Sequence, residues 1–151
     1  MYPPVEPLHS RAGSLVAEFE QGGGTSYIEG AIDLDREALD LCPPGHPTRS
    51  VSLACLAHHL WLRYGRLGVT GDLEEAVVLV QEALDLCPQG HPLQSISLNS
   101  LAICLATRYE KLGAMGDLNE AIVFFFFFFF VTSFIVLRAW PFVGQYSQCD
   151  T

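Results

Sequence analysis

Apolar residues recur along the chain with the spacing of one face of an α-helix. Between residues 98 and 112 they stand three or four positions apart, at Leu98, Leu101, Ala102, Leu105, Tyr109 and Leu112. Residues 53–67 carry the same stripe. A second stripe comprises Leu73, Ala76, Val77, Val80, Ala83 and Leu84, and is followed by Pro88, which has no backbone N–H to continue a helix. These patterns predict an all-α chain.

The chain repeats itself with a period of 45 residues. EALDLCPPGHP at 37–47 returns as EALDLCPQGHP at 82–92, and residues 53–76 align with 98–121 without insertion or deletion. Such fixed self-similarity is typical of stacked supersecondary units. We expect about two and a half units, over residues 10–47, 48–92 and 93–123, after a disordered N-terminus at 1–9.

Each unit divides into two helices joined by a short turn. Gly68 and Gly113 stand where a left-handed helix terminus favours glycine. The motif GDLEEA or GDLNEA follows, and we expect Asp72 and Asp117 to accept hydrogen bonds from the first backbone N–H groups of the second helix. Glu75, three residues after Asp72, completes a capping-box pattern.

The unit resembles the tetratricopeptide repeat. The positions that carry the resemblance are Leu56-Ala57 or Leu101-Ala102 on the first helix, Ala76 and Ala83 on the second, and the closing Pro88. The resemblance is closest to long-period repeats found in tandem in large fungal proteins, with the phrase ALDLCPPGHP and a following SLNxLA, here at 97–102. The usual period of about 34 is exceeded mainly because the first helix is longer. The resemblance implies antiparallel helix pairs stacked into an α-solenoid.

In such repeats the first helices line an inner face that meets a peptide or protein partner. By position within the resemblance, the candidate partner-binding residues are His58, Trp61, Arg63, Asn99, Ile103 and Thr107. Asn99 is implied to bond the main chain of the ligand, whereas Trp61 has packing into the neighbouring unit as an alternative role. The implied function is a non-catalytic interaction module, a scaffold or adaptor fragment.

Composition narrows the classes of partner. Eight basic and seventeen acidic residues give a net charge of −9 and a pI near 4.8, and an acidic surface repels the phosphates of nucleic acid. The start, MYPPVEPLHS, has no apolar signal region. We therefore expect a cytoplasmic protein with reduced cysteines and no nucleic-acid partner.

The motif C-x-x-x-H occurs twice, at Cys42/His46 and Cys87/His91, and contains two types of zinc ligand. Equivalent residues of stacked units lie on the order of 10 Å apart, too far to share one ion. The glycines at 22–24 lack the Gly-Lys-Ser/Thr of a phosphate loop. We expect no metal, no cofactor, no small-molecule substrate and no enzymatic activity.

The period ends at Val123, where a run of phenylalanines begins. Residues 121–140 contain few polar side chains and would measure about 30 Å as a helix, enough to cross a bilayer core. Three interpretations stay open: a single-pass membrane helix that anchors a cytosolic adaptor, a hydrophobic helix packed on the last unit, or translation of a thymine-rich intron or shifted frame. In the last case the chain is a truncated fragment of a larger signalling protein with such repeats. Residues 141–151 form a tail.

Overall fold

The computed structural model describes residues 4–87, 92–113, 116–117, 119–124 and 126. Over these residues it is helical and has no strand, which confirms the all-α prediction. The helices are α1 (Glu6–Glu20), α2 (Thr25–Asp40), α3 (Arg49–Leu67), α4 (Thr70–Asp85) and α5 (Pro92–Leu112). Residues 116–117, 119–124 and 126 are also helical.

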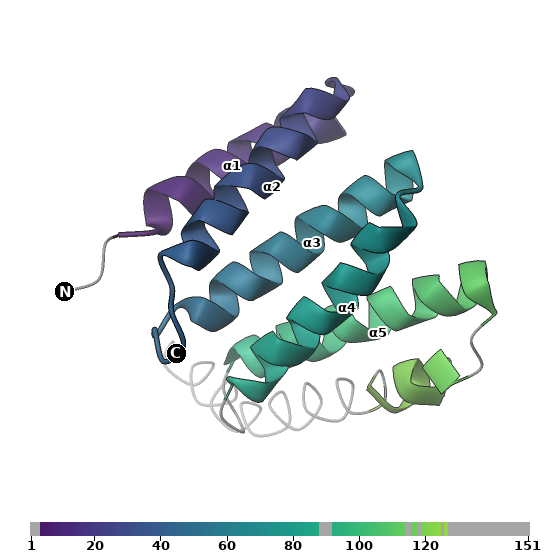
Figure 1. Cartoon of the computed structure of the whole chain (residues 1–151). Helices are drawn as coiled ribbons and strands as arrows, with labels where there is room; N and C mark the ends of the chain where they lie inside the picture. Colours follow the sequence, from purple (N-terminus) through teal and green to yellow (C-terminus); the bar gives the residue numbers. More distant parts are fainter. Residues whose placement is uncertain (1–3, 88–91, 114–115, 118, 125, 127–151) are drawn as a thin grey trace, which may run out of the picture.

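Successive helices run antiparallel and form two layers (Figure 1). One layer holds α1, α3 and α5, and the other holds α2 and α4. Helix α2 packs against both α1 and α3, and α4 packs against both α3 and α5. Each helix of the second layer therefore covers the seam between two helices of the first.

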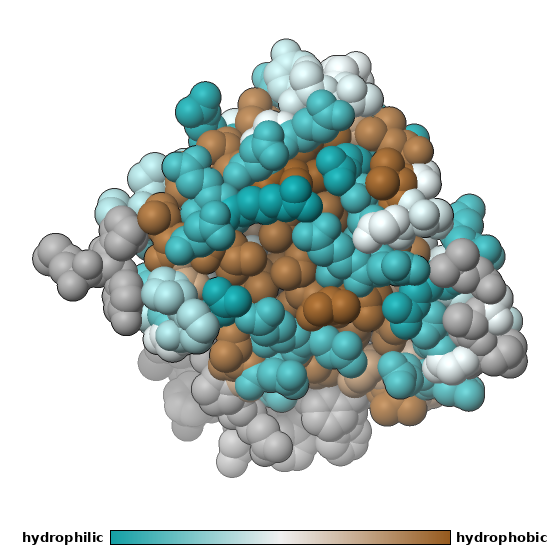
Figure 2. Space-filling view, in the orientation of Figure 1, coloured by the Kyte–Doolittle hydropathy of each residue, from teal (hydrophilic) through white to brown (hydrophobic). Residues whose placement is uncertain are grey.

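Small residues lie where the helices cross. Ala57 of α3 and Ala76 and Ala83 of α4 are fully buried, and Ala102 of α5 is nearly so. A methyl side chain lets backbones approach closely, while leucines such as Leu60 fill the space beside them; burying one leucine stabilises the fold by about 1.5–3 kcal/mol. The face over α2 and α4 mixes hydrophilic and hydrophobic residues (Figure 2).

The predicted glycine termini are confirmed. Gly68 has φ 69° and Gly113 has φ 68°, both in the left-handed region that glycine adopts without strain. The Gly68 amide donates to the Tyr64 carbonyl at 2.8 Å, and the Gly113 amide donates to the Tyr109 carbonyl at 2.8 Å. The first helix of each pair thus ends in the same way in both copies.

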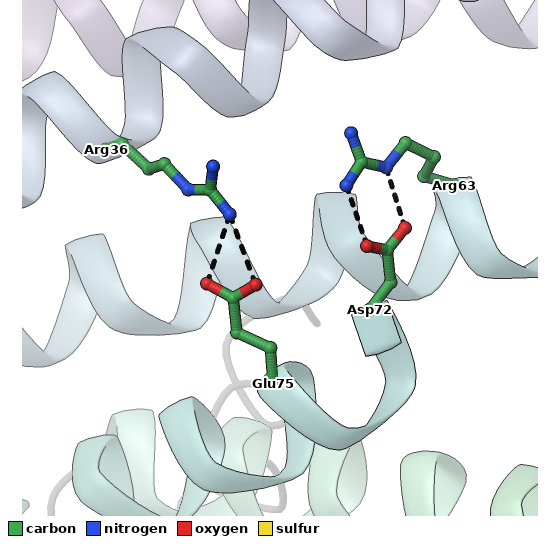
Figure 3. Close-up of polar contacts among 4 residues, drawn as sticks. All are labelled: Arg36, Arg63, Asp72 and Glu75. Atoms are coloured by element: carbon green, nitrogen blue, oxygen red, sulfur yellow. Dashed lines mark hydrogen bonds and ion pairs between the residues drawn. The ribbon is translucent and has the colours of Figure 1, made fainter. Parts of the chain in front are cut away.

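The predicted capping of α4 by Asp72 is wrong. The helix begins at Thr70 after Val69, and no side chain caps it. Asp72 lies inside the first turn, where its carboxylate accepts two hydrogen bonds from Arg63, at 2.6 and 2.7 Å (Figure 3). Glu75 binds Arg36 of α2 instead of the N-terminal backbone (Figure 3). A guanidinium carries a positive charge that a backbone amide lacks, and Arg63 offers two parallel N–H donors, so the contacts with arginine prevail.

Residues 4–9 also differ from the expected disorder at 1–9. Helix α1 begins at Glu6 with a proline in its first turn, a position that suits proline because the first N–H groups have no intrahelical partner. Val5 is 2% exposed and packs with Ala38 and Cys42 at the end of α2. This apolar contact holds the start of the chain against the second helix.

The C-terminal predictions fall largely outside the described residues. Most of the hydrophobic segment 121–140 and all of the tail 141–151 lie there. Within the part that the structure describes, no helix combines the length and apolar character required to cross a membrane.

Candidate interaction groove

A hollow of about 450 Å³ lies between α3 and α5. It includes residues from both helices, among them Val51, Ala54 and Trp61 of α3 and Ile96, Asn99 and Ile103 of α5. Ile96 is 56% exposed and Ile103 is 38% exposed, so apolar side chains face solvent here. We call this hollow the α3/α5 groove.

Four of the six predicted partner-binding residues line the α3/α5 groove, namely His58, Trp61, Asn99 and Ile103. Thr107 lies beside it, because its hydroxyl accepts a hydrogen bond from the Trp61 indole at 3.3 Å. The same hydroxyl donates to the Ile103 carbonyl at 2.8 Å. Arg63 is not part of the lining, since its guanidinium is held by Asp72.

Trp61 has two structural roles. It packs against the core and bonds Thr107 of α5, which connects two successive helix pairs. Its indole also stacks on the His58 imidazole, with ring centroids 6.0 Å apart and an interplanar angle of 24°. Partial desolvation in this setting lowers the pKa of His58, and the neighbouring His59 lowers it further. His58 therefore presents a neutral ring to the groove at physiological pH.

Arg63 and Asp72 form an ion pair that recurs one period later. Arg108 donates to Asp117 with the same two distances, 2.6 Å from Nε and 2.7 Å from Nη2. Hydrogen bonding to the carboxylate raises the pKa of each arginine, and the hydrogen bond that Arg108 donates lowers the pKa of Asp117. The pair joins the first helix of each hairpin to the start of the second.

Sequence reasoning missed this role of the arginines, although a signal was present. Arg63 and Asp72 are nine residues apart, and both residue types return 45 positions later. A pair of opposite charges that recurs together indicates a structural contact more than a ligand contact.

A second buried pair lies at the joint between α2 and α3. Asp35 is fully buried, and its Oδ2 accepts a hydrogen bond from Nδ1 of His59. Among the described atoms, Oδ1 of Asp35 has no hydrogen-bond partner. His59 also lines the α3/α5 groove. No feature of the sequence drew attention to Asp35, because its partner is 24 residues away.

Two cysteines line the same groove. Burial raises the pKa of Cys55 to about 11, with a smaller contribution from the charge of Asp35. Burial also raises the pKa of Cys104 to about 11. The thiolate is the nucleophilic and metal-binding form of cysteine. At neutral pH both side chains are thiols and behave as small apolar groups.

The first C-x-x-x-H copy forms part of a turn. Cys42 Sγ lies 3.5 Å from the hydroxyls of Thr48 and Ser52, and His46 Nδ1 accepts from the Thr48 amide at 3.2 Å. His91 of the second copy lies outside the described residues. Across the described ranges there is no cluster of three or more His, Cys, Asp or Glu side chains placed to hold a metal ion.

The α3/α5 groove is suited to bind a chain segment. Its walls are apolar, and Asn99 and Ser100 add hydrogen-bonding groups that can meet a peptide backbone. The thiols beside them are protonated at neutral pH, and His58 is neutral.

No protein-family model matches this chain, and neither a curated protein nor a solved structure matches it.

Proposed function

We propose that this chain is a tetratricopeptide-like α-solenoid module without catalytic activity, which binds a protein or peptide partner in the α3/α5 groove. The observation that carries the proposal is this apolar groove of about 450 Å³ between the first helices of two successive pairs. Exposed apolar surface that is grouped in a hollow is typical of binding sites, whereas scattered apolar residues are normal on any surface.

The repeated contacts support the solenoid part of the proposal. The Arg63–Asp72 and Arg108–Asp117 pairs share their geometry, and Gly68 and Gly113 share their backbone conformation. Equal contacts at a constant offset orient equal helices in the same way. Stacked helix pairs of this kind present an extended surface on one side, formed by the first helix of each pair.

Site-specific photocrosslinking tests the proposal. A benzoylphenylalanine placed at Ile103 lies in the α3/α5 groove, and one placed at Val78, which is 64% exposed on α4, lies outside it. We expect a protein to be crosslinked from position 103 and not from position 78 in the cytosol of the source cell. Identical products from both positions, or none from position 103, would refute the groove as the binding site.

A substitution then measures the contribution of one side chain. Asn99→Ala removes an amide from the groove wall and leaves α5 helical, since alanine is the best helix former. One hydrogen bond contributes about 1 kcal/mol, so we expect the affinity for the crosslinked partner to fall by roughly five- to tenfold. Val78→Ala on α4 serves as the control and should leave the affinity unchanged.

A further inference from the structure

The lining of the α3/α5 groove is uncharged. Among the residues that the structure describes, it includes no Lys, Arg, Asp or Glu side chain. The chain as a whole carries a net charge of −9. A partner that enters the groove thus meets an apolar surface within an acidic protein, and basic groups on the partner are favoured by this field.

Asp35 places a carboxylate behind the lining, in contact with His59. Its carboxylate is fully buried and, among the residues that the structure describes, has one hydrogen-bond partner, Nδ1 of His59. His59 has a side chain that is 10% exposed and lines the groove. Because Nδ1 is engaged by Asp35, Nε2 is the ring nitrogen that remains for a ligand. The charge of Asp35 reaches the groove wall, since it adds to the effect of burial in raising the pKa of Cys55.

The internal repeat shows that packing does not require this pair. One period later, Asp35 corresponds to Val80 and His59 corresponds to Cys104. Both of these residues are buried, at 1% and 3% exposure, and both line the groove. Apolar residues therefore occupy the corresponding positions of α4 and α5. Buried ion pairs are often no more stabilising than apolar residues of similar size, so packing alone does not account for Asp35 and His59.

We propose that the α3/α5 groove takes an apolar protein segment that carries one basic side chain, and that the Asp35–His59 pair selects this side chain. The ammonium or guanidinium of the partner donates a hydrogen bond to Nε2 of His59. The Asp35 carboxylate, on the other side of the ring, balances the positive charge. This inference rests on the proposed function, because it concerns the chemistry of the partner at the same groove.

The same arrangement rejects acidic segments. A carboxylate in the groove would lose its hydration, find no cationic side chain in the lining, and be repelled by the charge of Asp35. A neutral apolar side chain would be accepted but would leave Nε2 of His59 without a partner. Specificity arises from such unfavourable alternatives as much as from the favoured contact.

A peptide series tests the inference on the full chain. Short fluorescent peptides of leucine, alanine and serine carry lysine, norleucine or glutamate at one position, and this position is moved along the peptide. Fluorescence anisotropy measures each affinity. We expect lysine to bind about tenfold more tightly than norleucine at the best position, and glutamate to bind about tenfold more weakly than norleucine. Equal affinities of the three peptides would overturn the selectivity.

The chain offers its own matched variant. The double substitution Asp35→Val and His59→Cys copies the residues found one period later, and we expect it to fold and to lose the preference for lysine while it retains norleucine binding. Asp35→Asn, which keeps the size and removes the charge, gives a second readout with the same expectation. A preference for lysine that persists in both variants would contradict the role of the pair.

A control variant distinguishes a failure of this inference from a failure of the proposed function. Asn99→Ala changes the groove and leaves the Asp35–His59 pair intact, so it should weaken all three peptides and preserve their order. Peptides that bind equally, and are all weakened by Asn99→Ala, would keep the groove and refute the selection of a basic side chain. A lack of binding by every peptide would count against the groove and the inference together.

Discussion

Replacing Arg63 by methionine should destabilise the fold far more than replacing Arg36. Both guanidiniums bind a carboxylate of α4 (Figure 3). Arg63 donates from Nε and Nη2, at 2.6 and 2.7 Å, and Arg36 donates from Nη2 alone, at 3.1 and 3.2 Å. The two ion pairs also differ in how deeply they are buried. The side chains of Arg63 and Asp72 are 21% and 5% exposed, whereas those of Arg36 and Glu75 are 50% and 41% exposed.

The loss in free energy of unfolding depends on the carboxylate that each substitution leaves without its arginine. Arg63→Met leaves the Asp72 carboxylate nearly buried without its cation, and breaking a buried pair in this way costs about 3–5 kcal/mol. Arg63 is partly exposed, so water can reach the site, and we expect the lower value, about 3 kcal/mol. Arg36→Met leaves a solvated carboxylate and should cost less than about 1 kcal/mol. Single domains have a total stability of about 5–15 kcal/mol, so the first loss is large.

Urea unfolding followed by far-ultraviolet circular dichroism measures both changes. The double substitution Arg63→Met and Asp72→Leu removes the buried charge together with its partner, and it should recover most of the lost stability. A free energy of unfolding for Arg63→Met within about 0.5 kcal/mol of the parent would refute the reasoning. So would an equal loss for Arg36→Met, because burial would then not control the energy of these pairs.

Two further predictions concern the ends of the helices. Gly68→Ala forces an alanine to φ 69°, which should lower the free energy of unfolding by about 1–2 kcal/mol. Gly65→Ala, inside α3, should raise it by about 0.5–1 kcal/mol. Neither new methyl group meets a neighbouring atom, so opposite shifts in melting temperature would check this prediction. The hydrogen bond from Arg108 lowers the pKa of Asp117 in the folded protein. The ionised Asp117 carboxylate therefore contributes to stability above the ordinary carboxyl pKa, and this contribution disappears as the pH falls through the lowered value. In acid titrations of stability, Asp117→Asn should therefore flatten the loss at low pH, and an unchanged pH profile would contradict the pairing.

Local patterns in the sequence predicted the helices well. The apolar spacing in residues 53–67 and 73–84 corresponds to α3 and α4, and Gly68 ends α3 in the predicted left-handed conformation. These features depend on residues within a few positions of one another, because helix periodicity and glycine conformation are local properties. The start of α1 was harder to predict, since Val5 is held by Ala38 and Cys42, more than thirty residues away.

The contacts between polar side chains could not be predicted from local patterns in the sequence. Asp72 has the position and side chain of a helix cap, yet Arg63 competes for its carboxylate and prevails. Asp35 and His59 are separated by 24 residues and belong to different helices, so their contact depends on how α2 packs against α3. The groove likewise exists only because α3 and α5 lie side by side with α4 across their seam.

The amino-acid sequence by itself determined the helical class, the left-handed termini at Gly68 and Gly113 and the 45-residue repeat, because each of these depends on the type and spacing of residues along the chain. Only the tertiary structure decided that Arg63 is a structural residue and that His59 belongs to the groove. A charged side chain binds whichever opposite charge or polar group is closest in space, and that distance is set by the packing of helices that are remote in the chain.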